Sequence, residues 1–112
     1  MVNDMNVICR GTTPRCVCRI AENLERYDLF FSIGPALRSA WFTVPQDRMD
    51  MEYGENETTA IFTLTQHETL LCKEGKAIAE LRAIDGNGDA RASNIIEVNI
   101  IDIVKDGVIH YV

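Results

Sequence analysis

The sequence predicts an all-β sandwich of about seven short antiparallel strands, formed as a single domain. Apolar and polar residues alternate along several short runs, and a period of two gives a strand one buried and one exposed face. About seven such runs recur every ~8–12 residues with turn formers between them, which is typical of sandwich domains. A chain of 112 residues can bury one core but not two, so residues 1–112 are expected to form one domain.

The clearest pattern is a hairpin within residues 76–104. Apolar residues alternate with polar ones over 77–83 and again over 96–100. Between these runs, Asp85-Gly86-Asn87-Gly88-Asp89 is a cluster of turn formers and predicts a long hairpin loop. Ile101 is apolar at a position where an exposed residue is expected, which predicts a β-bulge that switches the two faces.

The other elements are predicted in chain order from the same period and from turn residues. Residues 1–9 are expected to be a flexible start, and residues 36–38 a single helical turn. Further strands are expected at 15–21, 39–44, 49–53 and 58–64. Another strand is expected after a turn at 22–23 and should end at Gly34-Pro35, because proline cannot donate to a strand ladder.

One short helix is expected near residues 65–73. Thr65 and Glu68 have the spacing of a capping box, in which each side chain accepts a hydrogen bond from the other residue's backbone N–H. Gly75 closes the segment. A helix of about two turns depends on packing more than on intrinsic propensity, so we expect it to connect two strands and pack against them.

The charge distribution bears on possible partners. The net charge is −6: residues 1–48 hold six arginines against five acidic residues, and residues 49–112 hold five basic against twelve acidic residues. An acidic surface repels phosphate backbones, so no nucleic-acid partner is expected. No apolar run reaches the ~18 residues of a membrane span, and the start of the chain lacks the features of a signal peptide. We expect no membrane association and a cytoplasmic site of synthesis.

No catalytic, metal or cofactor site is predicted. The four cysteines are expected to stay reduced, and Cys16 and Cys18 should point to the same face of a strand, where they cannot readily bridge. No pair of cysteines has the C-x₂-C spacing of a zinc site. The loop 85–89 resembles the start of a calcium loop, but Ala90 and Ile96 occupy its required Gly and Glu positions. The chain is therefore expected not to be an enzyme.

Two places are candidates for an interface. Trp41, the only tryptophan, is expected on an outer strand face, where a loop would cover it or a partner would contact it. The tail 105–112 is apolar at Val108, Ile109 and Tyr111, so it should dock on this domain or on a partner.

Four segments together resemble a known family. They read RGTTP at 10–14, LTQHETL at 64–70, ASNII at 92–96 and IVKDGVI at 103–109. In their order and spacing the chain resembles small prophage-encoded domains of Gram-positive bacteria and their phages. These are similar to the immunoglobulin-like N-terminal domain of siphophage baseplate upper proteins. The resemblance covers about residues 10–109.

The resemblance implies an immunoglobulin-like sandwich without catalysis or cofactor that acts as a building block of a phage tail or baseplate region. Its partners would be other phage virion or tail proteins, or a second copy of the chain. It would reside in the bacterial cytoplasm during assembly and then in the virion. The alternative is a stand-alone immunoglobulin-like module that binds a carbohydrate or a host protein. That function would require exposed aromatic side chains, for which Trp41, Tyr27 and Tyr53 are the candidates.

Overall fold

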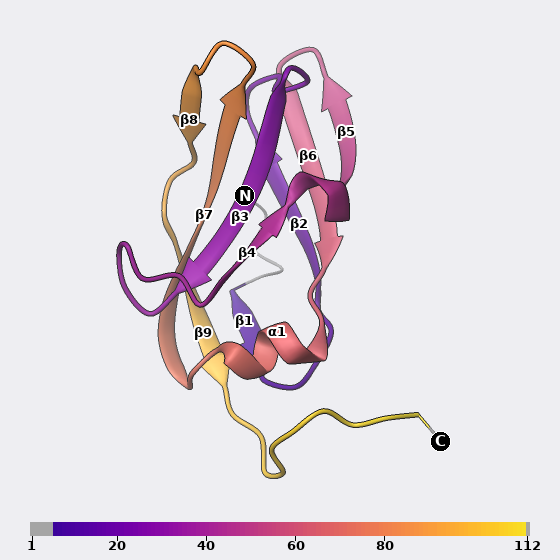
Figure 1. Cartoon of the computed structure of the whole chain (residues 1–112), viewed down its shortest axis with the longest axis vertical. Helices are drawn as coiled ribbons and strands as arrows, with labels where there is room; N and C mark the ends of the chain where they lie inside the picture. Colours follow the sequence, from indigo (N-terminus) through magenta and orange to yellow (C-terminus); the bar gives the residue numbers. More distant parts are fainter. Residues whose placement is uncertain (1–5, 112) are drawn as a thin grey trace.

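The computed structural model describes residues 6–111 and is mostly β (Figure 1). Within this range, nine strands, one short α-helix and a single 3₁₀ turn at Gln46–Arg48 follow one another along the chain. They are β1 (Val7–Cys9), β2 (Arg15–Ile20), β3 (Tyr27–Gly34), β4 (Phe42–Pro45), β5 (Asp50–Gly54), β6 (Glu57–Thr63), α1 (Gln66–Leu71), β7 (Gly75–Asp85), β8 (Ala90–Ala92) and β9 (Ile96–Ile101).

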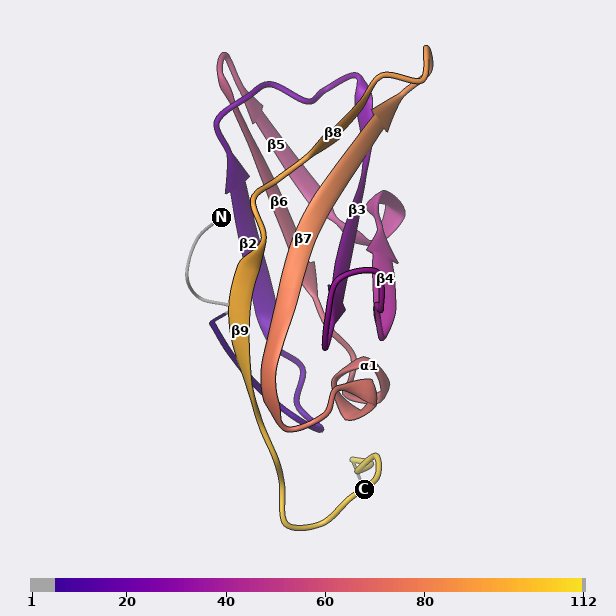
Figure 2. The same ribbon diagram turned by 90° about the vertical axis from the view of Figure 1, so that its left-hand side faces the viewer.

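The strands form two sheets that face each other, as Figure 2 shows from the side. The larger sheet has the order β1-β9-β7-β3-β4, with β8 also paired to β7, and the smaller sheet has the order β2-β6-β5. The predicted all-β, two-sheet architecture is confirmed. The predicted strand count was too low, because the short β1 and β8 were not anticipated. The expectation of purely antiparallel pairing was also wrong, since β1 runs parallel to β9.

The core lies between the sheets and follows the predicted alternation. In β3, Leu29, Phe31 and Ile33 are buried, while Phe30 between them points outward. The rings of Phe31 and Phe62 meet across the sheets with centroids 4.9 Å apart and tilted by 48°. Burial of these side chains is the main source of stability, because apolar area removed from water contributes roughly 25 cal/mol per Å².

The predicted hairpin is present, but its second strand is interrupted and forms two shorter strands. β9 pairs with the start of β7, and β8 pairs with the end of β7 next to the Asp85–Asp89 loop. Between them Ser93 maintains the connection: its backbone N–H donates to Leu81 O, and its hydroxyl accepts from Leu81 N. The predicted face switch at Ile101 is wrong. Ile101 is 50% exposed and is the last residue of β9.

The connection from β3 to β4 is a tight turn and not the predicted helical turn. Ser39 N donates to Ala36 O at 3.2 Å, and Arg38 has a φ of 65°, a left-handed conformation that a helix does not contain. The turn folds back onto the end of β3, where a Cβ on Gly34 would lie 2.0 Å from Ser39 O. Glycine at position 34 therefore permits this close approach.

The predicted helix is confirmed, although it is shorter than expected and ends at Leu71. Thr65 and Glu68 form both hydrogen bonds of the capping box. Thr69, the buried residue of α1, donates from its hydroxyl to Thr12 O at 2.8 Å, which ties the helix to the segment before β2. α1 thereby covers one end of the two-sheet core (Figure 1).

The start of the chain contributes a strand. Of the expected flexible start 1–9, residues 7–9 form β1, with Ile8 buried against the core, and residues 1–5 lie outside the described range. Within residues 6–111, no helix is long and apolar enough to cross a membrane.

Candidate interaction surfaces

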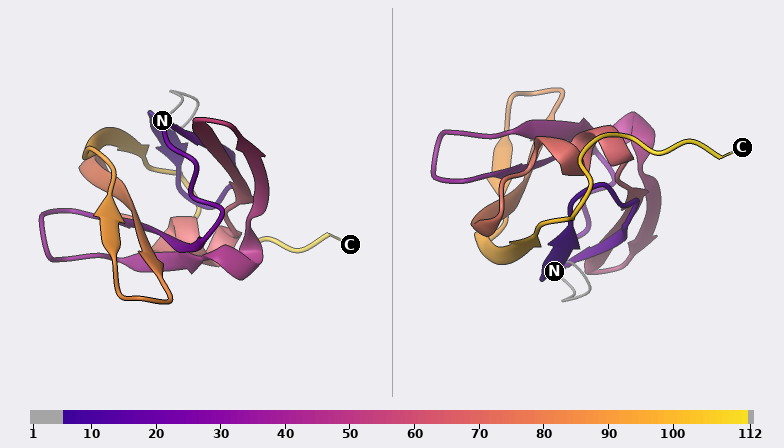
Figure 3. Two further views of the ribbon diagram at one scale, coloured as in Figure 1. Left: turned by 90° about the horizontal axis from the view of Figure 1, so that it is seen from above. Right: turned by 90° about the horizontal axis from the view of Figure 1, so that it is seen from below.

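The C-terminal arm, defined as residues 102–111, leaves the end of β9 and runs beneath α1 (Figures 1 and 3). Its apolar side chains face water: Val104 and Tyr111 are fully exposed, Ile109 is 69% exposed and Val108 is 44% exposed. Three of these, Val108, Ile109 and Tyr111, are the tail residues predicted as an interface. The arm thus places several large apolar side chains in solvent within one short segment, which is unusual for a protein surface.

Arg10 fixes the base of the arm to the helix. Its guanidinium donates to Cys72 O at 2.8 Å and to Leu70 O at 2.9 Å, which are carbonyls at the end of α1 without a helical partner. The same group pairs with Asp102 at 2.7 Å and with Asp106 at 3.5 Å. The hydrogen bond between Arg10 and Asp102 raises the pKa of Arg10 and lowers the pKa of Asp102. One side chain thereby connects β1, α1 and the arm.

Gln66 holds the arm further along. Its side-chain Nε2 donates to Ile109 O at 3.0 Å, and its Oε1 accepts from Ile109 N at 2.9 Å. A carboxamide carries the same donor and acceptor as a peptide group, so Gln66 pairs with Ile109 as a neighbouring strand would. Both bonds involve the backbone of Ile109. Its side chain remains exposed.

A second ion pair fixes α1 to the smaller sheet. Arg48 donates to both carboxylate oxygens of Glu68, at 2.8 Å to Oε1, and to Thr63 O at 3.0 Å. The Arg48 hydrogen bond lowers the pKa of Glu68, and the capping bonds from Thr65 act in the same direction. The position of α1, and with it of Gln66, is therefore fixed from two sides.

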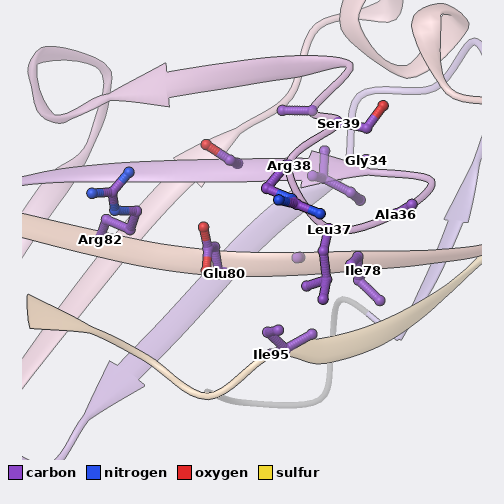
Figure 4. Close-up of a pocket in the computed structure, with 13 residues that line it drawn as sticks. Gly34, Ala36, Leu37, Arg38, Ser39, Ile78, Glu80, Arg82 and Ile95 are labelled. Carbon is purple, nitrogen blue, oxygen red and sulfur yellow. The ribbon is translucent and has the colours of Figure 1, made fainter.

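A groove of about 240 Å³ lies between the β3–β4 turn and the outer face of β7 (Figure 4). Leu37, Ile78 and Ile95 provide its apolar wall, and Arg38 and Arg82 provide positive charge. Its lining contains one carboxylate, that of Glu80, and no histidine or cysteine. The groove thus combines an apolar wall with positive charge.

The three aromatic candidates do not form one surface. The side chain of Trp41 is half-buried and packs against the core, and the backbone N–H of Trp41 donates to the carbonyl of Ile33 near the end of β3. Tyr27 lies at the opposite end of β3, where its hydroxyl donates to Asp89. Tyr53 pairs in β5 with Thr58 of the smaller sheet. The predicted site residue Trp41 and the tail residues thus belong to separate regions.

Three of the four thiols lie inside the domain. No disulfide joins the cysteines; Cys16, Cys18 and Cys72 are buried, and Cys9 is partly exposed. Burial raises the pKa of Cys16 and of Cys18 to about 12, and the pKa of Cys72 to about 11, so they are protonated at neutral pH and poor nucleophiles. Among residues 6–111, no three histidine, cysteine or acidic side chains gather as a metal site would require.

Comparisons with protein-family models, with curated proteins and with solved structures found no match to this chain.

Sequence reasoning missed the residues that fix the arm. Gln66 and Arg10 act on partners 43 and 60 or more positions away, through backbone atoms that carry no sequence signal. Arg38 was also missed, because a positive φ at a non-glycine residue has no consistent local pattern. The capping-box spacing was the one available signal, since it places Gln66 at the first position of the helix.

Proposed function

We propose that this chain is a non-catalytic structural protein of a phage or prophage, in the tail or baseplate region, that acts through protein–protein contacts. One observation carries the proposal: the C-terminal arm exposes apolar side chains, while Arg10 pairs with two of its carboxylates and Gln66 bonds to its backbone. Exposed apolar groups on a positioned segment favour a protein partner, because association removes their surface from water.

The strand order supports an immunoglobulin-like sandwich. In that fold, strands B, E and D form one sheet and strands C, F and G form the other. With β2 as strand B, the smaller sheet β2-β6-β5 has the order B-E-D. The larger sheet then contains β3, β7 and β9 as C, F and G, with β4 as an added strand beside C. The domain lacks the disulfide of antibody domains, and Phe31 and Phe62 pack across the sheets instead.

The phage assignment rests on the resemblance of residues 10–109 to baseplate domains. We propose on this basis that the chain resides in the bacterial cytoplasm during assembly and then in the virion, with other phage virion or tail proteins or a second copy as partners. The structure adds a segment suited to such contacts. The alternative carbohydrate-binding function gains no support, since Trp41, Tyr27 and Tyr53 form no common platform and none of them lines the groove of Figure 4.

Site-specific photo-cross-linking in cells that produce the phage particles tests the proposal. A photoreactive amino acid replaces Tyr111 in the arm or, as the control, Asn56 in the turn between β5 and β6. We expect position 111 to give a discrete adduct with a protein that also occurs in purified particles, and position 56 to give none. Equal labelling at both positions, or absence of the chain and its adducts from the particles, would contradict the proposal.

A further inference from the structure

We propose that Gln66 is a backbone clamp for an extended segment, and that two copies of the chain exchange arms so that each arm docks on Gln66 of the other copy. This inference rests on the proposed function and names the partner of the C-terminal arm. The exchange would use the contacts of a single copy in reciprocal form, as domain swapping does.

The clamp recognises backbone and not side chain. Gln66 bonds to both the N–H and the C=O of Ile109, at 2.9 and 3.0 Å, and each contact is to a main-chain atom. α1 itself is fixed by Arg48 and Arg10, so the carboxamide is presented from a positioned element. Any copy of this chain carries the same clamp and the same extended residue, and a second copy is therefore a complete match.

The arm has a flexible point between its anchored base and the clamped residue. Asp102 pairs closely with Arg10, whereas Asp106 lies 3.5 Å from the same guanidinium. Gly107 follows with a φ of 99°, and no heavy atom lies within 4 Å of the place a Cβ would occupy. A change of backbone angle at this open glycine would redirect residues 108–111 without disturbing the base of the arm.

Within one copy, docking leaves the apolar side chains in water. Val108, Ile109 and Tyr111 stay exposed while the backbone of Ile109 is paired. In an exchanged dimer the two hydrogen bonds per clamp are retained. The two arms would also run side by side across the two-fold axis and cover each other's apolar side chains. That added burial is the term that favours two copies over one.

Ion pairs partly neutralise the charges that hold α1 and the base of the arm. Asp102 and Asp106 pair with Arg10, and Glu68 pairs with Arg48. The whole chain carries a net charge of −6, so this pairing lowers the repulsion that a second copy would meet at the clamp.

Two full-length variants break the clamp from opposite sides. Gln66→Ala removes the carboxamide, and Ile109→Pro removes the backbone N–H that donates a hydrogen bond to the carboxamide oxygen. His67→Ala, at the next and exposed helix position, is the matched control. We measure mass by sedimentation and light scattering over a concentration series. The unaltered chain and H67A should be dimers, and each clamp variant alone should dissociate at concentrations at least about tenfold higher than the unaltered chain does.

Mixing the two variants gives the decisive measurement. A Q66A copy retains a competent arm and an I109P copy retains a competent Gln66, so one complete exchanged contact can form between them. Neither variant alone can form a complete contact, because Q66A lacks the carboxamide and I109P keeps only the carbonyl of residue 109. We expect a mixed dimer from two differently tagged variants, weaker than the unaltered dimer but tighter than either variant by itself.

Several results would overturn arm exchange. These are an unaltered chain that stays monomeric up to millimolar concentration, a dimer that neither clamp variant weakens, and variants that fail to restore a dimer when mixed. None of these would by itself remove the proposed function, because a cross-link from position 111 to a different virion protein would still support it. The proposed function is tested separately, since absence of the chain and its adducts from purified particles would contradict it whatever the mass measurements show.

Discussion

The two-sheet core and the C-terminal arm are held together by different forces. In the core, Leu29, Phe31 and Ile33 are removed from water, and the apolar side chains themselves supply the stability. In the arm the distribution is reversed. Polar contacts hold it, from Arg10 to its carboxylates and from Gln66 to its backbone, while the apolar side chains remain in solvent.

The difference separates residues that stabilise the domain from residues that are available for contacts. Substitution of a buried side chain in the core should lower the unfolding free energy. Substitution of an exposed side chain in the arm should leave the unfolding free energy nearly unchanged. The arm is therefore the part of the molecule where binding can be altered without unfolding, and four substitutions test this division in order of decreasing effect on stability.

Phe31→Ala should give the largest loss. The ring is fully buried and packs 4.9 Å from that of Phe62, so its removal leaves a cavity and costs about 3–5 kcal/mol of unfolding free energy. Phe30→Ala on the outward face of the same strand is the control and should cost about 1 kcal/mol or less. Urea denaturation measures both. Similar losses for the two would show that β3 does not have one buried and one exposed face.

Gly34→Ala should rank second. The new methyl group would lie 2.0 Å from the backbone oxygen of Ser39, so the β3–β4 turn must move, at a cost of about 2–3 kcal/mol. Gly86→Ala is the matched control, because nothing lies within 4 Å of its added methyl group and its φ is not positive. Thermal denaturation of the two variants should differ clearly. An unaffected G34A protein would contradict the close approach of the turn.

Glu68→Gln should cost about 1 kcal/mol at pH 7, because it removes a charged partner of Arg48 and weakens the capping box. The pH dependence is the sharper readout. Folding lowers the pKa of Glu68 from its ordinary value of 4.5, so its ionised form stabilises the folded state above that pH. This stability is lost as the pH falls through the lower, folded pKa.

Unfolding free energies measured between about pH 7 and pH 3 should therefore fall less steeply for E68Q than for the unaltered chain. The two curves should converge at the acidic end, where Glu68 is protonated in both folded and unfolded states. Parallel curves over this range would mean that the Arg48 pair does not bind the ionised carboxylate preferentially.

The features predicted correctly from the sequence are those set by local period or spacing. Alternation placed Leu29 and Phe31 in the core, and the Thr65–Glu68 spacing located the start of α1. Both signals arise from side chains close together in the chain, where backbone geometry determines which of them share a face.

The errors share a different origin. β1 was missed because a three-residue strand shows too little alternation, and its parallel pairing with β9 joins residues about 90 positions apart. The bulge at Ile101 was predicted because an apolar residue was expected to be buried, yet isolated exposed apolar residues are common on protein surfaces. The clamp at Gln66 depends on backbone atoms of a distant residue, which no local pattern reports.

Ile109→Ala should have the smallest effect on stability and is the most direct test of the division between core and arm. The side chain is 69% exposed, and the hydrogen bonds to Gln66 use only its backbone, so the unfolding free energy should change by less than about 0.5 kcal/mol. The same chemical change in the core, Ile33→Ala, removes a side chain that is 1% exposed and should cost about 2–5 kcal/mol. Urea denaturation compares the two, and the mass measured over a concentration series reports association. An I109A protein that keeps its stability but associates more weakly would assign the side chain to a contact with a partner. A loss of stability as large as that of I33A would instead show that the arm belongs to the core of the domain.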